Sequence, residues 1–110
     1  MVIRAEVLTV RTVADQPASG VLRVAVAGVL DEATAPDLRA ALDDAVAAGN
    51  PAVLEVDVAG VTYCSLAGLR VFGEVQHRFG GTLQLLGMGQ AIRRLLDLQQ
   101  RLAPAGTSRR

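Results

Sequence analysis

The stretch VTYCSLAGLRVF, from Val61 to Phe72, decides the fold of this chain. Its first residues read as the end of a buried β-strand, and from Ala67 onward the apolar spacing is that of a helix. Only a few residues can therefore form the joint between the two elements. Ser65 and Leu66 stand at that joint, a hydroxyl beside an apolar side chain. A buried strand followed directly by a helix is the building unit of layered α/β proteins.

Length and composition narrow the class of protein further. The chain has 110 residues, which is enough for one compact domain with a real core. Apolar residues make up 51% of the chain and aromatic ones only 3%, so the core must consist of aliphatic side chains. The single Cys64 cannot form an internal disulfide. We expect one domain over residues 1–102 that folds without metal or disulfide, followed by a flexible tail over 103–110.

The charge balance excludes several partners and chemistries. The formal net charge is zero, so the chain lacks the excess of positive charge that favours binding to nucleic acid or to an anionic membrane. The chain contains Arg but no Lys, which rules out a Walker-type phosphate lysine and Schiff-base chemistry. The N-terminal MVIRAEVLTV lacks the continuous apolar core of a signal peptide, and no stretch approaches the ~18 apolar residues of a membrane span. We therefore expect a soluble, cytoplasmic protein with no membrane insertion.

Apolar periodicity along the chain predicts the element order β-β-α-β-α-β-α. The predicted strands are Val2–Val10, Val21–Ala27, Val53–Val58 and Thr82–Leu86, with a polar break from Asp15 to Gly20, and the predicted helices begin near Thr34, near Leu66 or Ala67, and at Gln90. Right-handed crossovers between parallel strands place the intervening helices on one face of the sheet. The predicted fold is a single α/β domain with a mixed four-stranded sheet and three helices packed on one face.

Local signals mark the first helix, and periodicity marks the core. Thr34 can cap the helix, Pro36 suits its first turn and Asp37 completes a capping-box spacing. Gly49 supplies a stop signal. We expect the last helix to turn Ala91, Ile92, Leu95 and Leu96 inward. The side chains expected to be largely buried are Leu38, Leu42, Val46, Val56, Phe72, Val75, Leu85 and Leu95.

Three motifs add a resemblance to a known family. The first is VAGVLDEATAPDLRAALDDA, which is similar to a strand, a Gly-x-Leu-Asp turn and a helix of that family. The second is LEVDVAGVTYCSLAGLRVF, similar to the family's strand that ends in an Asp-Ser-Ser-Gly-Leu or Asp-Ser-Ala-Gly-Leu turn. The third is GGTLQLLGMGQAIRRLLDL, similar to its last common strand and helix. Together the motifs resemble the STAS domain of bacterial anti-sigma factor antagonists, over roughly Val7 to Leu98.

The resemblance gives the joint a functional meaning. Aligning Gly68 and Leu69 with the family's Gly-Leu puts Ser65 at the family's Asp and Leu66 at the position of its phosphorylated Ser. In the family a partner kinase phosphorylates that Ser to break a complex, since a phosphate adds nearly two negative charges at a helix N-terminus. Leu66 cannot accept a phosphate. The resemblance therefore implies a degenerate phosphorylation motif.

Ser65 and Leu66 each allow two interpretations. The Ser65 hydroxyl is either a cap for the free N–H groups of the second helix or a displaced phosphosite. Leu66 either packs against a neighbouring loop or forms an exposed apolar anchor for a partner. By the resemblance, the expected partner-binding surface consists of Gly28, Leu30, Asp31, Ser65, Leu66, Ala67, Gly68 and Leu69.

The residues do not support an enzyme. The only His, His77, lies on the second predicted helix, and a rise of ~1.5 Å per residue puts it about 18 Å along the axis from Ser65 or Cys64. One Cys and one His cannot close a tetrahedral metal site. The GMG segment from Gly87 to Gly89 lacks the third glycine of a dinucleotide-binding loop. We expect no catalytic residue, no metal and no cofactor.

Two non-catalytic functions remain. The resemblance implies a regulatory protein that binds a serine-kinase-type anti-sigma factor and thereby takes part in transcription regulation, with its off-switch weakened or absent. The alternative is a structural STAS subunit that docks on another protein, such as an ABC transporter ATPase or a stress-sensor complex. In place of the family's final strand and helix, RLAPAGTSRR ends this chain. The less protected sheet edge favours a homodimer or an obligate partner.

Overall fold

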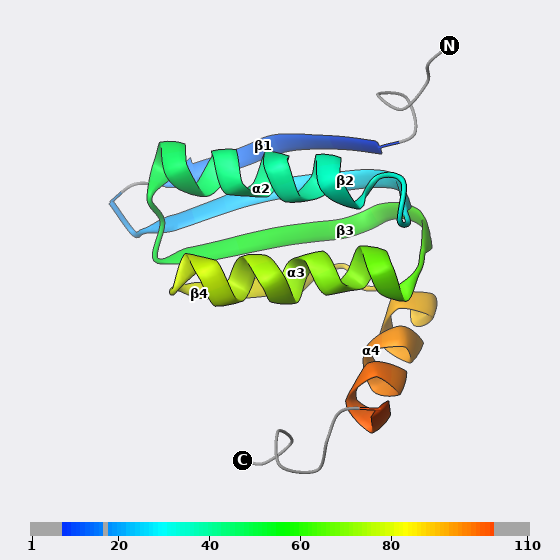
Figure 1. The fold of residues 1–110 in the computed structure, drawn as a ribbon. Coiled ribbons are helices and arrows are strands. Elements are labelled where there is room, and N and C mark those ends of the chain that lie inside the picture. Colours follow the sequence, from blue (N-terminus) through cyan, green and yellow to red (C-terminus); the bar gives the residue numbers. More distant parts are fainter. Residues whose placement is uncertain (1–7, 17, 103–110) are drawn as a thin grey trace.

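The computed structural model describes residues 8–16 and 18–102 (Figure 1). Its elements follow in the order β1 (Leu8–Gln16), β2 (Val21–Leu30), α2 (Ala35–Gly49), β3 (Val53–Cys64), α3 (Leu66–Phe79), β4 (Thr82–Leu86) and α4 (Gln90–Leu102). The predicted order of strands and helices is confirmed. The predicted strand residues 2–7 and the predicted tail over 103–110 lie outside the described residues.

The four strands form one mixed sheet in chain order, β1-β2-β3-β4. β1 pairs with β2 in antiparallel fashion, whereas β2, β3 and β4 run parallel to one another. Parallel neighbours need crossover connections, and α2 and α3 supply them. These two helices lie side by side over one face of the sheet, and α4 stands at the end of the helical layer in contact with α3 and β3 (Figure 1). A mixed four-stranded sheet with three helices is the predicted fold.

The core between the sheet and the helices is aliphatic, as the composition required. It includes Leu22, Val24, Val26, Leu54, Val56 and Val58 from the strands, and Leu38, Leu42, Leu69, Val71, Phe72 and Val75 from the helices. Three residues predicted to be largely buried, Val46, Leu85 and Leu95, are half-buried at its margin. Ala91 was expected to face inward but is exposed, because Ile92 is the residue at the start of α4 that reaches the core.

β3 runs past its predicted end at Val58 because its pairing with β2 is irregular. The register shifts twice, and each shift adds one residue to β3 relative to β2. The inward-facing positions therefore continue as Val58, Val61 and Cys64, three residues apart, instead of alternating. Tyr63, which the sequence placed at the end of a buried strand, is 57% exposed. β1 and β2 also run longer than predicted, to Gln16 and Leu30.

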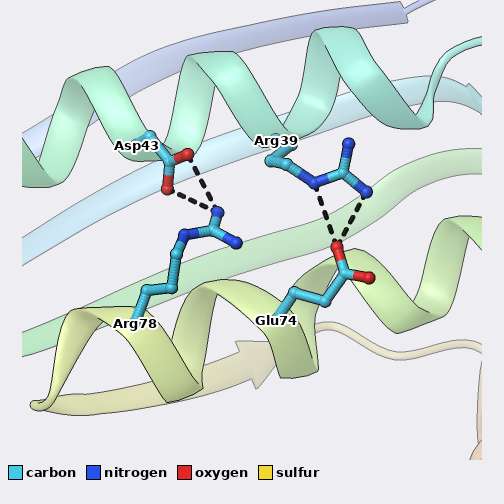
Figure 2. A network of polar contacts seen from close by, with 4 residues as sticks. All are labelled: Arg39, Asp43, Glu74 and Arg78. Carbon is cyan, nitrogen blue, oxygen red and sulfur yellow. Dashed lines mark hydrogen bonds and ion pairs between the residues drawn. The ribbon is translucent and has the colours of Figure 1, made fainter.

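Two ion pairs join the facing sides of α2 and α3 (Figure 2). Arg39 donates from Nε and Nη2 to Glu74 Oε1 at 3.0 and 2.7 Å, and Arg78 Nη2 lies 2.9 Å from both carboxylate oxygens of Asp43. Each helix thus offers one cation and one anion to its neighbour. Exposed pairs of this kind contribute about 0–1 kcal/mol each, so the packed core beneath them holds the helices in place. The pairs favour a single alignment of the two helices.

Candidate functional site

The N-termini of α2 and α3 lie at the same end of the sheet. Each helix follows one of two neighbouring parallel strands, β2 and β3, whose carboxyl ends therefore lie together (Figure 1). A shallow pocket of about 540 Å³ opens there. We call it the joint pocket, and its lining residues are Asp31, Glu32, Ala33, Tyr63, Ser65, Leu66 and Ala67. In open parallel sheets this is the edge at which loops present side chains to a ligand or partner.

The loop between β2 and α2 is held by a small polar network. Asp31 Oδ1 accepts hydrogen bonds from the backbone N–H groups of Ala33 and Thr34, at 2.9 and 3.0 Å. The Thr34 hydroxyl donates to Val29 O at 2.8 Å and accepts from the Asp31 N–H at 3.0 Å. The Thr34 side chain is 2% exposed, so its hydroxyl is satisfied inside the protein. The network fixes the Asp31 carboxylate at the mouth of the joint pocket.

This network replaces the predicted capping box. Thr34 is the N-cap residue of α2, but its side chain makes no cap hydrogen bond to the first turn. Its backbone is in the right-handed helical region (φ −96°, ψ −11°) rather than the extended region of an ordinary cap. The prediction that the Thr34 side chain caps α2 is therefore wrong. The hydroxyl turns back to the end of β2 instead, and Asp31 binds the free N–H groups.

The joint between β3 and α3 is capped by Ser65. Its backbone is extended (φ −98°, ψ 170°), and its Oγ accepts a hydrogen bond from Gly68 N at 3.2 Å. The Ser65 N–H donates to Leu30 O at 2.9 Å, which ties the start of α3 to the end of β2. The cap interpretation of Ser65 is confirmed. Leu66 is half-buried in the joint pocket beside the loop over residues 31–33, so part of its side chain packs and part stays accessible.

The structure divides the expected partner-binding residues into two groups. Asp31, Ser65, Leu66 and Ala67 line the joint pocket. Leu30, Gly68 and Leu69 are buried, so they support the pocket from below. The expected contact role of these three residues stays a prediction, and their burial gives them a supporting position instead of an exposed one. Gly28 belongs to neither group: it is half-buried, with φ +106°, at the second register shift between β2 and β3.

Three pocket residues were missed by the sequence analysis: Glu32, Ala33 and Tyr63. Glu32 and Ala33 follow the Asp31 turn, and only the parallel pairing of β2 and β3 brings them opposite Tyr63. The apolar part of the pocket comes from Tyr63, Leu66 and small alanines, and its charge comes from two carboxylates. Among the residues that the structure describes, no basic side chain lines it. Glu32 is exposed and makes no ion pair with a described residue.

Cys64 is close to this pocket in sequence but faces the core. It is 8% exposed, and its Sγ donates to Ser65 O at 3.4 Å. Burial raises the pKa of the Cys64 thiol, so the thiol stays protonated at neutral pH. A protonated, buried thiol is a poor nucleophile.

The lone His lies at a separate surface. His77 is on the exposed side of α3, in a depression with Arg70, Gly73, Glu74 and Arg78, and it does not line the joint pocket. Within residues 8–16 and 18–102, no three side chains of His, Cys, Asp or Glu are grouped as a metal site would require. None of the described helices is long and apolar enough to span a bilayer.

Comparison with known proteins places this geometry in a family. The profile of the family described as "Mlab, STAS domain" matches residues 12–100. None of the curated proteins compared with this chain matches it. Among solved structures, an anti-sigma factor antagonist from Mycobacterium paratuberculosis is 28% identical, with a TM-score of 0.72 over 84% of this chain and 77% of its own.

Two further structures share the fold at lower identity. The anti-sigma factor antagonist SpoIIAA in its unphosphorylated form is 13% identical, with a TM-score of 0.68 over 83% of this chain and 80% of its own. An antisigma-factor antagonist STAS domain from Rhodobacter sphaeroides is 17% identical, with a TM-score of 0.62 over 79% of this chain and 94% of its own. Because the family profile covers residues 12–100 of the 110, the chain belongs to the STAS domain family.

Proposed function

We propose that this protein is a regulatory protein-binding module that binds a serine-kinase-type anti-sigma factor through the joint pocket. Membership of the STAS family and the similarity to an anti-sigma factor antagonist support a binding role. The pocket is shallow and open, which suits a protein surface better than a small molecule. Binding to the anti-sigma factor would release a sigma factor and so regulate transcription.

One observation carries the proposal: Leu66 and Tyr63 form an accessible apolar pair between two helix N-termini. Tyr63 is 57% exposed, and an aromatic side chain of that exposure is a common anchor in protein interfaces. The carboxylates of Asp31 and Glu32 stand at the margin of this pair and provide a polar rim. The proposed contact residues are therefore Asp31, Glu32, Tyr63, Ser65, Leu66 and Ala67.

The proposed complex lacks the usual off-switch. The position of the family's phosphorylated Ser is Leu66, and the neighbouring Ser65 hydroxyl is already bound to Gly68 N. A phosphate on Ser65 would have to displace that cap. We therefore propose that kinase activity of the partner does not dissociate this complex.

The test is a calorimetric titration of the protein with each serine-kinase-type anti-sigma factor encoded in the same genome. We expect one of them to bind wild-type protein, and to bind Tyr63→Ala more weakly by about 10-fold or more, as for an interface anchor. Tyr63→Phe, which keeps the ring, is the matched variant and should retain most of the affinity. Absence of binding to every such factor would contradict the proposal.

A second candidate function is a structural STAS subunit that docks on another protein, such as an ABC transporter ATPase or a stress-sensor complex. The absence of a phosphoacceptor at Leu66 favours this candidate, because a permanent subunit needs no release signal. The same pocket would form the interface. A pull-down with wild-type protein and with Tyr63→Ala distinguishes the two functions. If the protein that binds wild type but not Tyr63→Ala is a small ATP-binding kinase, the first function is supported. If it is a transporter ATPase, the second is supported.

A further inference from the structure

A second charged surface lies on α4, at the same end of the molecule as the joint pocket. A depression of about 440 Å³ is lined by Met88, Gln90, Arg93, Arg94, Leu96 and Asp97, which we call the α4 patch. The guanidinium groups of Arg93 and Arg94 are exposed and pair with no side chain in the described part of the chain. Leu98, one turn further along, is 43% exposed.

The joint pocket has the opposite character. Its charged lining residues in the described chain are Asp31 and Glu32, and both are acidic. Glu32 makes no ion pair within the described residues, and of the Asp31 carboxylate only Oδ1 is bound. Carboxylates without an ion pair to a described residue, beside the exposed Tyr63, therefore match guanidinium groups without an ion pair to a described residue, beside the exposed Leu98. Within the described part of the chain, each surface thus combines charged side chains that make no ion pair, Glu32 in one and Arg93 and Arg94 in the other, with a large exposed apolar side chain.

The positions of the two surfaces decide what can bring them together. α4 contacts α3, and it begins next to the end of the helical layer at which α3 starts (Figure 1). The joint pocket and the α4 patch are thus neighbours at one end of each molecule. Two copies that face each other through this end can place each α4 patch against the other copy's joint pocket, so every contact is made twice around a two-fold axis.

We propose that the protein forms a closed homodimer in which Arg93 and Arg94 of each copy bind the carboxylates of Asp31 and Glu32 of the other. The dimer covers Tyr63 and Leu66 and so competes with partner binding at the joint pocket. Leu66, at the proposed position of the family's phosphorylated Ser, cannot control access to the pocket by phosphorylation. Self-association would control access instead, through protein concentration and salt. Free protein at high concentration is held as a dimer, and dilution releases monomers that can bind.

The test is sedimentation equilibrium of the purified protein without any partner, from about 5 µM to about 500 µM. The average mass should rise from the 11.5 kDa of the monomer to twice that value and no further. Raising NaCl from about 0.05 M to about 0.5 M should weaken the dimer, because salt screens charges at an interface rim. A monomer at every concentration, or growth beyond the dimer, would overturn the proposal.

Charge reversal identifies the surfaces. Glu32→Arg and Arg94→Glu should each raise the dissociation constant of the dimer at least about tenfold, because each variant places two charges of the same sign against each other across the interface. An equimolar mixture of the two variants should recover it, because each joint pocket then again faces an α4 patch of opposite charge. Matched controls are Asp44→Arg on α2 and Arg11→Glu on β1, both exposed positions outside the two surfaces, and they should leave the dimer unchanged.

Two results would reject this assignment even if a dimer forms: survival of the dimer in both reversed variants, or failure of the mixture to recover it. Neither measurement contains the anti-sigma factor or any other partner. A negative result therefore removes the homodimer and leaves the proposed function of the joint pocket to its own test.

Discussion

Gly68, in the first turn of α3, lies directly against Leu30, the last residue of β2. A Cβ atom at position 68 would be 2.8 Å from the carbonyl carbon, the carbonyl oxygen and the Cβ of Leu30. Three residues earlier, the Ser65 N–H donates to the same Leu30 carbonyl oxygen at 2.9 Å. The close approach of helix to strand therefore requires glycine here, and it sets how near the two sides of the joint pocket lie.

Gly68→Ala should destabilise the protein by about 1–3 kcal/mol, the usual cost of forcing a methyl group into packed atoms. The atoms it meets include backbone, which cannot move aside as a flexible side chain can. Gly73→Ala is the matched control on the same helix, since no atom of a described residue lies within 4 Å of its Cβ position. That variant should gain about 0.5–1 kcal/mol from helix propensity. Urea unfolding of both variants checks the prediction, and equal effects would contradict it.

Leu66→Asp should abolish partner binding without unfolding the protein. A charge placed at the centre of the joint pocket must be desolvated on binding, which costs several kcal/mol, so affinity should fall at least about a hundredfold. An acidic residue in the first turn of α3 is favourable to the helix dipole, so the thermal midpoint should change little. Val13→Asp, at an apolar residue of β1 that is 48% exposed, is the control and should keep its affinity. A collapse of the thermal midpoint would show that Leu66 is a core residue.

Incubation with a serine-kinase-type anti-sigma factor and ATP should leave the wild-type protein unmodified. In the proposed alignment Leu66 takes the position of the family's phosphorylated Ser, and the Ser65 Oγ accepts a hydrogen bond from Gly68 N at 3.2 Å. Leu66→Ser restores a hydroxyl at that position and should gain one phosphate, which intact-mass measurement detects. A phosphate on wild type that disappears in Ser65→Ala would instead establish Ser65 as a displaced phosphosite.

The buried thiol predicts a loss of stability at alkaline pH. Burial raises the pKa of Cys64, so the native state keeps the thiol proton to a higher pH than the unfolded chain does. The free energy of unfolding should therefore be unaffected at neutral pH and fall as pH rises above about 8.5, the ordinary thiol pKa. Cys64→Ala lacks this titration. Urea unfolding at pH about 7 and about 10 should show a smaller decline in the free energy of unfolding for Cys64→Ala than for wild type. Identical declines would show that ionisation of Cys64 does not cause the loss of stability.

Much of the fold was determined by local patterns in the sequence. β4 has the predicted bounds, α4 begins at the predicted Gln90 and α3 begins at the predicted joint, because helical and strand apolar spacing act over a few residues. The cap by Ser65 was also predictable, since its partner Gly68 is only three residues away. The family resemblance was inferred from the same local stretches, and the family profile confirms membership of the family.

Tertiary structure decided which residues come together in the joint pocket, including Glu32, Ala33 and Tyr63, which the sequence analysis missed. Parallel pairing of β2 with β3 brings the loop at Asp31–Ala33 against Tyr63–Ala67, although the two segments are far apart in sequence. The two register shifts in β3 depend on its partner strand, so the exposure of Tyr63 could not be read from alternation. Likewise the Thr34 hydroxyl bonds to Val29 at the end of β2 instead of capping its own helix. Local spacing fixes which residues form strands and helices, whereas contacts between distant segments decide which of them reach the surface.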